Sequence, residues 1–294
     1  MFLIFIKKAI YFNQIKSFLS GLETNNSIED CKFINNTSTN LGGAIYLLNP
    51  SDLRITNCSF EKNNALDGSA IYYEESNLAE LILNSSYFYQ NFARENGAAL
   101  YISGSIIAII ENCTFTTNSI QQNQQNLGSV IFLNNPGNLT IIYSNFEYNE
   151  GILGTCISYS ETSYKIIFPN SNYFLILADN AFMILTQNYF KNNFALLGGG
   201  GIYFQNKLLS ESPYQNNIFM DNIAPFANDF FTFPVRLKLI NNKSISYSSK
   251  TKAYSLSVIP GITLTSLNFA VVDYYGQTIK SMNGGLLFIF INLI

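Results

Sequence analysis

The sequence predicts an all-β fold, a right-handed parallel β-helix, over most of its 294 residues. Two short blocks that recur at a common period, and the apolar/polar alternation beside them, support this prediction. One such unit is too short to bury its own apolar face, so neighbouring units must stack into a solenoid. We expect coils over residues 26–235 and an irregular segment or cap over residues 1–25. Residues 236–294 are expected to form a β-rich extension from a truncated β module.

The first block is Phe-x-x-Asn, which recurs at seven equivalent positions of the repeat. Its first three steps are 27, 28 and 27 residues, and later steps of 31, 44 and 29 residues indicate loops inserted between equivalent units. We expect each Phe ring in the core, where its burial contributes about 1.5–3 kcal/mol. We expect each Asn at a corner, capping backbone groups and bonding to the Asn of the next coil. These structural residues are Phe33, Phe60, Phe88, Phe115, Phe146, Phe190 and Phe219, with Asn36, Asn63, Asn91, Asn118, Asn149, Asn193 and Asn222.

The second block is rich in glycine and begins a strand, as in GGAIY at 42–46 and GSAIY at 68–72. Its aliphatic position is followed by an aromatic one, so the two side chains point to opposite faces of the strand. With the aliphatic face inward, the sequence predicts an exposed aromatic ladder on the outer face, broken at Ser158. This candidate binding ladder consists of Tyr46, Tyr72, Tyr101, Phe132 and Tyr203.

A leucine-rich repeat has a similar period and is the alternative fold. Such repeats usually carry a helix or a 3₁₀ segment on the convex side, whereas here the segment after each Asn runs directly into a glycine-rich strand. The β-helix is therefore favoured, with helix content near zero. Beyond residue 236 both blocks are missing, and LNFAVVDYYGQTI indicates a hairpin that turns at Gly276.

Composition excludes several function classes. The chain has 16 basic and 19 acidic residues, a net charge of -3, which argues against a nucleic-acid partner. Histidine, the commonest general base and metal ligand, is absent. The four cysteines, Cys31, Cys58, Cys113 and Cys156, lack zinc-site spacing, so we expect neither metal nor cofactor. The first three fall in one inward column, which favours small buried thiols over disulfides.

A polysaccharide lyase or hydrolase is the less favoured alternative. Glycoside hydrolysis requires two carboxylates that face one cleft at a set separation. The acidic candidates fall in different columns of the repeat and are Asp67, Glu74, Glu75, Glu95, Glu111, Glu147 and Glu150. We therefore expect no catalytic residues and no enzymatic activity.

The GGAI and Phe-x-x-Asn blocks resemble those of chlamydial polymorphic outer-membrane proteins and the pectin-lyase-like coils of large surface proteins of ciliated protozoa. The resemblance covers about residues 26–230. The segment ANDFFTFPVRLKL, followed by LSVIPGITLTSLNFAVVDYYGQTI, looks more like the ciliate group. The resemblance implies a surface-exposed adhesive or structural region with no reaction attached to it.

These observations predict a non-catalytic scaffold that is extracellular or displayed on the cell surface. The alternative is a module that binds glycans or surface proteins through the candidate binding ladder, since aromatic rings on a rigid scaffold can stack on sugars. Outward rings can also stack on one another simply to stabilise parallel strands, and this explanation is slightly favoured.

Potential glycosylation sites suit a secreted glycoprotein and lie at Asn25, Asn35, Asn36, Asn57, Asn84, Asn112, Asn138 and Asn242. Neither terminus carries the roughly 20 apolar residues that span a bilayer. Membrane contact is therefore expected only through regions outside this chain.

Overall fold

A computed structural model describes residues 5–7, 11–13, 26–48, 52–74, 79–104, 106–121, 128–134, 138–160, 183–204, 216–225, 227–232, 234–239, 245–248, 253–256 and 269–273. Every regular element within these ranges is a β-strand. None of the described residues forms a helix long and apolar enough to cross a membrane. The chain divides into two compact units, Met1–Thr232 and Phe233–Ile294.

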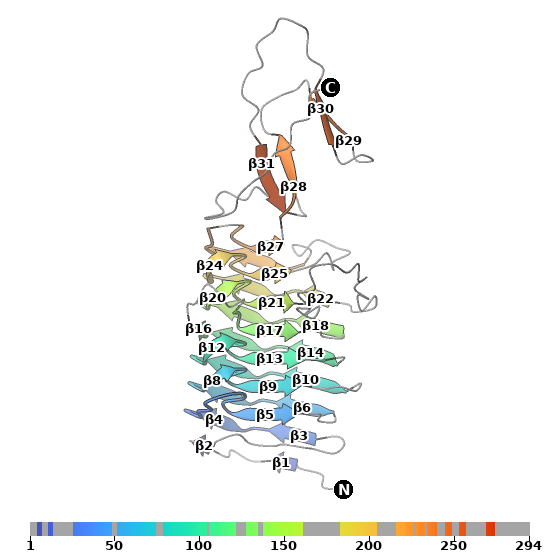
Figure 1. The fold of residues 1–294 in the computed structure, drawn as a ribbon. Coiled ribbons are helices and arrows are strands. Elements are labelled where there is room, and N and C mark those ends of the chain that lie inside the picture. The colour runs from blue at the N-terminus through green and yellow to red at the C-terminus, as the bar shows by residue number, and fades with distance from the viewer. Residues whose placement is uncertain are drawn as a thin grey trace, which may run out of the picture. The chain divides into compact units, whose positions relative to one another are not determined.

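The first unit is a stack of parallel coils, which confirms the predicted β-helix (Figure 1). Each complete coil contributes one strand to each of four sheets. The first sheet contains β1 (Phe5–Lys7), β3 (Asn26–Glu29), β6 (Leu53–Thr56), β10 (Glu80–Asn84), β14 (Ile107–Glu111), β18 (Asn138–Ile142) and β22 (Met183–Thr186). The second sheet contains β2 (Tyr11–Asn13), β4 (Lys32–Ile34), β7 (Ser59–Glu61), β11 (Tyr87–Tyr89), β15 (Thr114–Thr116), β19 (Asn145–Glu147), β23 (Tyr189–Lys191) and β26 (Ile218–Met220).

The other two sheets of the first unit follow in each coil. The third sheet contains β8 (Asn64–Asp67), β12 (Phe92–Asn96), β16 (Ser119–Ile120), β20 (Glu150–Leu153) and β24 (Phe194–Gly198). The fourth sheet contains β5 (Ile45–Leu48), β9 (Ile71–Glu74), β13 (Leu100–Ser103), β17 (Ile131–Asn134), β21 (Ile157–Ser160), β25 (Ile202–Phe204) and β27 (Phe230–Thr232).

Strand register follows the repeat and not the number of residues between strands. Phe60 pairs with Phe88, one regular step away, and Phe146 pairs with Phe190 across the longest step. The insertions at residues 122–127 and 161–182 lie outside the described residues. Across the first insertion β14 still pairs with β18, and across the second β18 still pairs with β22. A single register is expected, because a slip of one residue would turn each apolar side chain to the other face.

The corners of the coils repeat a left-handed backbone conformation. Asn57 and Asn112 both have φ of 52°, a region that asparagine tolerates better than most residues. Gly68 has φ of 60° at the start of the fourth sheet. A Cβ atom at Gly68 would lie 2.6 Å from the Ile71 carbonyl oxygen and 2.9 Å from the Tyr72 Cβ, so a side chain does not fit there. Both backbone conformation and space explain the recurring glycine.

The amino-terminal strands extend the first two sheets. Strands β1 and β2 pair in parallel with β3 and β4, so part of the segment expected to be irregular or a cap continues the stack. The rest of residues 1–25 lies outside the described residues.

The second unit contains two antiparallel pairs. One joins β28 (Pro234–Leu239) to β31 (Phe269–Asp273), and the other joins β29 (Ile245–Ser248) to β30 (Ala253–Leu256). The turn expected at Gly276 lies outside the described residues, and β31 takes β28 as its partner.

Candidate functional site

The phenylalanines of the Phe-x-x-Asn block form one continuous stack inside the second sheet. Successive rings from Phe33 to Phe219 have centroids 4.7–5.0 Å apart and planes within 2–10° of each other. The first six rings are 0% exposed, and Phe219 at the last rung is partly exposed. A stack of this kind combines full apolar burial with ring-to-ring contact. Six of the seven rings therefore lie in the core, and Phe219 continues their stack at its partly exposed end.

The asparagines of the same block form a buried hydrogen-bond ladder. Each Oδ1 from Asn63 to Asn222 accepts from the backbone N–H of the preceding Asn at 2.9–3.1 Å and from its Nδ2 at 2.9–3.2 Å. Each Nδ2 from Asn63 to Asn222 also donates to a Phe carbonyl oxygen, as Asn91 does to Phe60 at 2.9 Å. Asn36 to Asn193 are 0% exposed, and Asn222 is 4% exposed. Their amides are therefore used within the fold.

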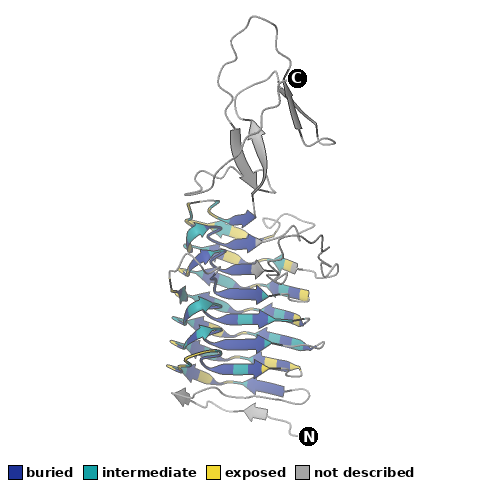
Figure 2. Ribbon diagram, viewed as in Figure 1, coloured by how far each residue is buried: buried dark blue, intermediate teal, exposed yellow. Residues whose placement is uncertain are grey.

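The candidate binding ladder is stacked, but the prediction that it is exposed is wrong. Tyr72, Phe132 and Tyr203 are buried, with exposures of 6%, 5% and 1%, and only Tyr46 and Tyr101 are partly exposed. Strands β9 and β17 are accordingly drawn as buried along nearly all their length (Figure 2). The side chains do alternate outward, as predicted, yet solvent does not reach most of them.

Two contacts cover these rings. Neighbouring rings lie on one another, with centroid distances of 5.6 Å for Tyr46 and Tyr72, 4.7 Å for Tyr72 and Tyr101, and 5.3 Å for Tyr101 and Phe132. The glycine corners also pack against the base of the column, as the contact between Gly68 and the Tyr72 Cβ shows. The column is interrupted at Ser158, as predicted, where a fully buried hydroxyl has no hydrogen-bond partner among the described residues.

Acidic side chains border the same column. The Tyr72 hydroxyl donates to Glu74 Oε2 at 2.6 Å, and burial, with this hydrogen bond, raises the pKa of Tyr72 well above its ordinary value. Burial raises the pKa of Asp67 to about 6, although Asp67 Oδ1 accepts from the Asn96 backbone N–H and Nδ2 at 2.9 and 3.1 Å. The described residues place no three Cys, Asp or Glu side chains where they could hold a metal ion.

Asp67→Asn is expected to stabilise the fold at neutral pH. The raised pKa means that the folded state holds a proton between about pH 4 and pH 6 that the unfolded state has released. The free energy of unfolding therefore falls as pH rises through this window. The new amide oxygen would keep the acceptor for Asn96, so we expect a gain on the order of 1–2 kcal/mol at pH 7.5, after allowing for solvent screening at this partly exposed site.

Urea unfolding at pH 3.5 and 7.5 measures this effect, with exposed Glu150→Gln as the control. At pH 3.5 Asp67→Asn should match the wild type. A loss of stability at pH 7.5 would contradict the assigned environment of Asp67.

The cysteines are buried free thiols, and three of them belong to a second hydrogen-bond column that the sequence did not predict. Cys58 Sγ accepts from the Cys31 backbone N–H at 3.4 Å, and the Cys58 N–H donates to Ser86 Oγ at 3.1 Å. Further along the column, the backbone N–H of each residue donates to the side chain of the next coil, from Cys113 to Ser144, Asn188 and Asn217. The sequence could have indicated this column, because each of these small side chains carries a hydrogen-bond acceptor atom. Burial raises the pKa of Cys58 and of Cys113 to about 12, so neither is an activated nucleophile.

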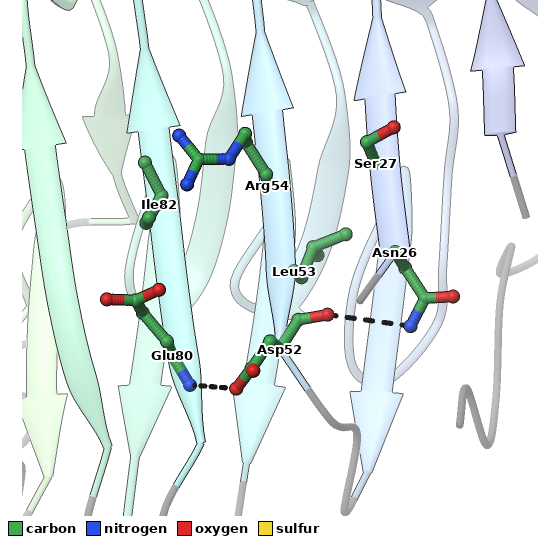
Figure 3. Close-up of a pocket in the computed structure, with 7 residues that line it drawn as sticks. All are labelled: Asn26, Ser27, Asp52, Leu53, Arg54, Glu80 and Ile82. Atoms are coloured by element: carbon green, nitrogen blue, oxygen red, sulfur yellow. Dashed lines mark hydrogen bonds between the residues drawn. The ribbon is translucent and has the colours of Figure 1, made fainter. Parts of the chain in front are cut away.

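A polar pocket of about 300 Å³ lies on the outer face of the first sheet. Strands β3, β6 and β10, with the residue directly before β6, supply its lining residues, which are Asn26, Ser27, Asp52, Leu53, Arg54, Glu80 and Ile82 (Figure 3). The chain enters β6 through Asp52, whose Oδ1 accepts from the Glu80 backbone N–H at 2.9 Å. The sequence prediction missed this site, although the step of 28 residues between adjacent coils places Asp52 beside Glu80 and Arg54 beside Ile82.

Comparisons with known proteins agree with this architecture. The family described as "Right handed beta helix region" matches residues 10–105. A "Metabotropic glutamate receptor-like protein R" of Dictyostelium discoideum is 25% identical over 229 residues, which are 78% of this chain and 12% of that protein. The chain thus spans about an eighth of the length of this relative. No solved structure matches the chain. Sequence and structure together identify a right-handed parallel β-helix repeat protein.

Proposed function

We propose that the chain is a non-catalytic scaffold of β-helix coils, displayed outside the cell as part of a longer, membrane-anchored protein. The observation that supports this most is that the side chains which define the repeat make contacts within the fold. The phenylalanines are stacked in the core and the asparagine amides bond to one another, so the residues that define the repeat maintain the solenoid. Such a rod holds other surfaces at fixed spacing, because each coil adds one strand spacing along its axis.

The proposal of a non-catalytic role has a direct test. We expect the purified chain to release no reducing ends and no unsaturated products from pectate, alginate or chitin, compared with a heat-denatured sample. Cleavage that depends on native protein would overturn this part of the proposal. Among the sequence candidates, Asp67 accepts two hydrogen bonds from Asn96 and contributes to the raised pKa of Tyr72 and Tyr101, an arrangement that supports a structural role.

Binding through the candidate binding ladder is the weaker proposal. A sugar needs an open ring face, and the stacking of Tyr72 between Tyr46 and Tyr101 leaves neither of its faces free. This geometry favours rings that stabilise parallel strands over rings that stack on a ligand. Glycans and surface proteins remain candidate partners through other surfaces of the coils.

An extracellular location has three supports. These are the receptor-like relative, the resemblance to bacterial and protozoan surface proteins, and the sequons. The folded chain presents Asn35, Asn57, Asn112 and Asn138 to solvent, whereas Asn36 is fully buried with its amide bonded to Asn63. Asn25 and Asn242 lie outside the described residues.

We therefore expect glycan occupancy at the exposed sequons and none at Asn36 in protein purified from its native cells. Mass spectrometry after enzymatic deglycosylation in ¹⁸O water measures occupancy at each site. Occupancy at Asn36 in folded protein would contradict the buried ladder. Unmodified protein in the cytosol would contradict the proposed location.

A further inference from the structure

The pocket on the first sheet separates charges of opposite sign. Asp52, which directly precedes β6, and Arg54 within β6 both line the pocket and are two residues apart, which corresponds to about 6.6 Å of extended chain. Figure 3 shows Arg54 and Ser27 at one end of the pocket and Asp52, Glu80 and Asn26 at the other. One guanidinium therefore faces one end, and two carboxylates face the other.

Two of these three charged groups are not used within the fold, whereas Asp52 Oδ1 accepts a hydrogen bond from the Glu80 backbone N–H. The Arg54 guanidinium and the Glu80 carboxylate make no hydrogen bond or ion pair within the described part of the chain. The Ser27 side chain lines the same pocket and is 9% exposed, and its buried hydroxyl finds no hydrogen-bond partner in that part of the chain. Only 12% of the chain is charged, so three charged side chains around one pocket are a local concentration. A buried hydroxyl without a partner points to a group missing from the site.

The chemistry of the lining selects the ligand. A guanidinium favours a carboxylate, with which it forms charge-assisted and often bidentate hydrogen bonds. Two carboxylates favour an ammonium group, whose three N–H bonds can be shared between them. A simple anion would meet the repulsion of Asp52 and Glu80, and a simple cation that of Arg54. A volume of about 300 Å³ is at the small end of ligand sites and suits a molecule of few heavy atoms, with Ile82 providing an apolar contact.

We propose that this pocket binds a small zwitterion, with its carboxylate on Arg54 and its ammonium group between Glu80 and Asp52. The site is independent of the scaffold role, because all three charged side chains lie on the outer face and none belongs to a ladder.

Isothermal titration of the full chain with 4-aminobutyrate, butyrate and butylammonium tests the proposal, since the last two probes each lack one of the charges. We expect saturable binding of 4-aminobutyrate, and binding at least about tenfold weaker for each singly charged probe, because each loses a charge-assisted hydrogen bond. Arg54→Gln should abolish the advantage of 4-aminobutyrate over butylammonium. Glu80→Gln should reduce its advantage over butyrate.

The control is Glu111→Gln, which removes a carboxylate from the outer face of the same sheet away from the pocket. It should leave binding unchanged, and circular dichroism should show that all variants fold. Three results would overturn the proposal: no saturable binding up to about 10 mM, equal binding of the three probes, or unchanged binding by Arg54→Gln. None of them would affect the proposed scaffold function.

Discussion

Replacing Phe88 with alanine is expected to lower the free energy of unfolding by about 3–5 kcal/mol. The ring is 0% exposed and stacks on Phe60 and Phe115, with centroids 4.9 and 4.7 Å away. Parallel coils on both sides hold their own rings in place, so the cavity cannot close by a local shift. Urea unfolding followed by circular dichroism measures the change.

The matched control for this variant is Tyr87→Ala, one residue earlier in β11 and 38% exposed. Its cost should stay within about 1 kcal/mol. If Phe88→Ala were as mild as Tyr87→Ala, the Phe stack would not be the main source of packing energy in the second sheet.

Asn91→Leu should be comparably destabilising, by on the order of 4 kcal/mol, for an electrostatic reason. The substitution nearly preserves volume but removes four hydrogen bonds. Two of these bonds are accepted from Asn63, and two are donated to the Phe60 carbonyl and to Asn118 Oδ1. The Asn63 backbone N–H would remain buried without a partner, at a cost of about 1–3 kcal/mol, and the Phe60 carbonyl would lose the bond from the Asn91 amide.

An Asn→Leu substitution at an exposed position serves as the control, because it removes an amide without removing ladder hydrogen bonds. Asn145→Leu in β19 removes an amide that is partly exposed and lies outside the ladder, and its effect should stay within about 0.5 kcal/mol. Comparable effects from Asn91→Leu and Asn145→Leu in urea unfolding would show that the ladder contributes no more than a surface amide.

The fold was predictable because equivalent positions of the repeat pair with one another even where a loop is inserted between them. Phe146 and Phe190 are separated by 44 residues, yet they pair directly, as Phe60 and Phe88 do across 28. A solenoid transmits register through each coil, so residues with the same place in the motif become neighbours regardless of the loops between them. The face from which each side chain projects followed from alternation along the strands.

Exposure was not predictable from alternation. The place of Tyr72 in the alternating pattern gives the face of the strand from which its ring projects. It does not say which groups cover that face. Here the covering groups are the neighbouring rings and the corner at Gly68, whose approach depends on a left-handed backbone.

The pocket and the Cys–Ser–Asn column were missed for a different reason. Their members differ in chemistry from coil to coil: the cysteines mark only part of the column, and no repeated residue marks the pocket. Asp52, Arg54 and Glu80 become a group only when positions 28 residues apart are overlaid, and Cys58 matches Ser86 only as an acceptor. An overlay of the coils by hydrogen-bonding capacity, and not by residue identity, brings out both sites in the sequence alone.

The equivalence of the coils is the central claim, and deletion of one coil tests it most directly. Removing residues 61–88 takes out the span from one ring of the Phe stack to the next and rejoins Phe60 to Tyr89, which keeps the motif with Asn91. We expect this variant to keep a β-sheet circular dichroism spectrum and a cooperative thermal transition, with a midpoint within about 10 °C of the parent. Removing only residues 61–74 takes out β8 and β9, so one coil loses its strands in the third and fourth sheets, and should abolish the transition. Equal damage from the two deletions would contradict the account.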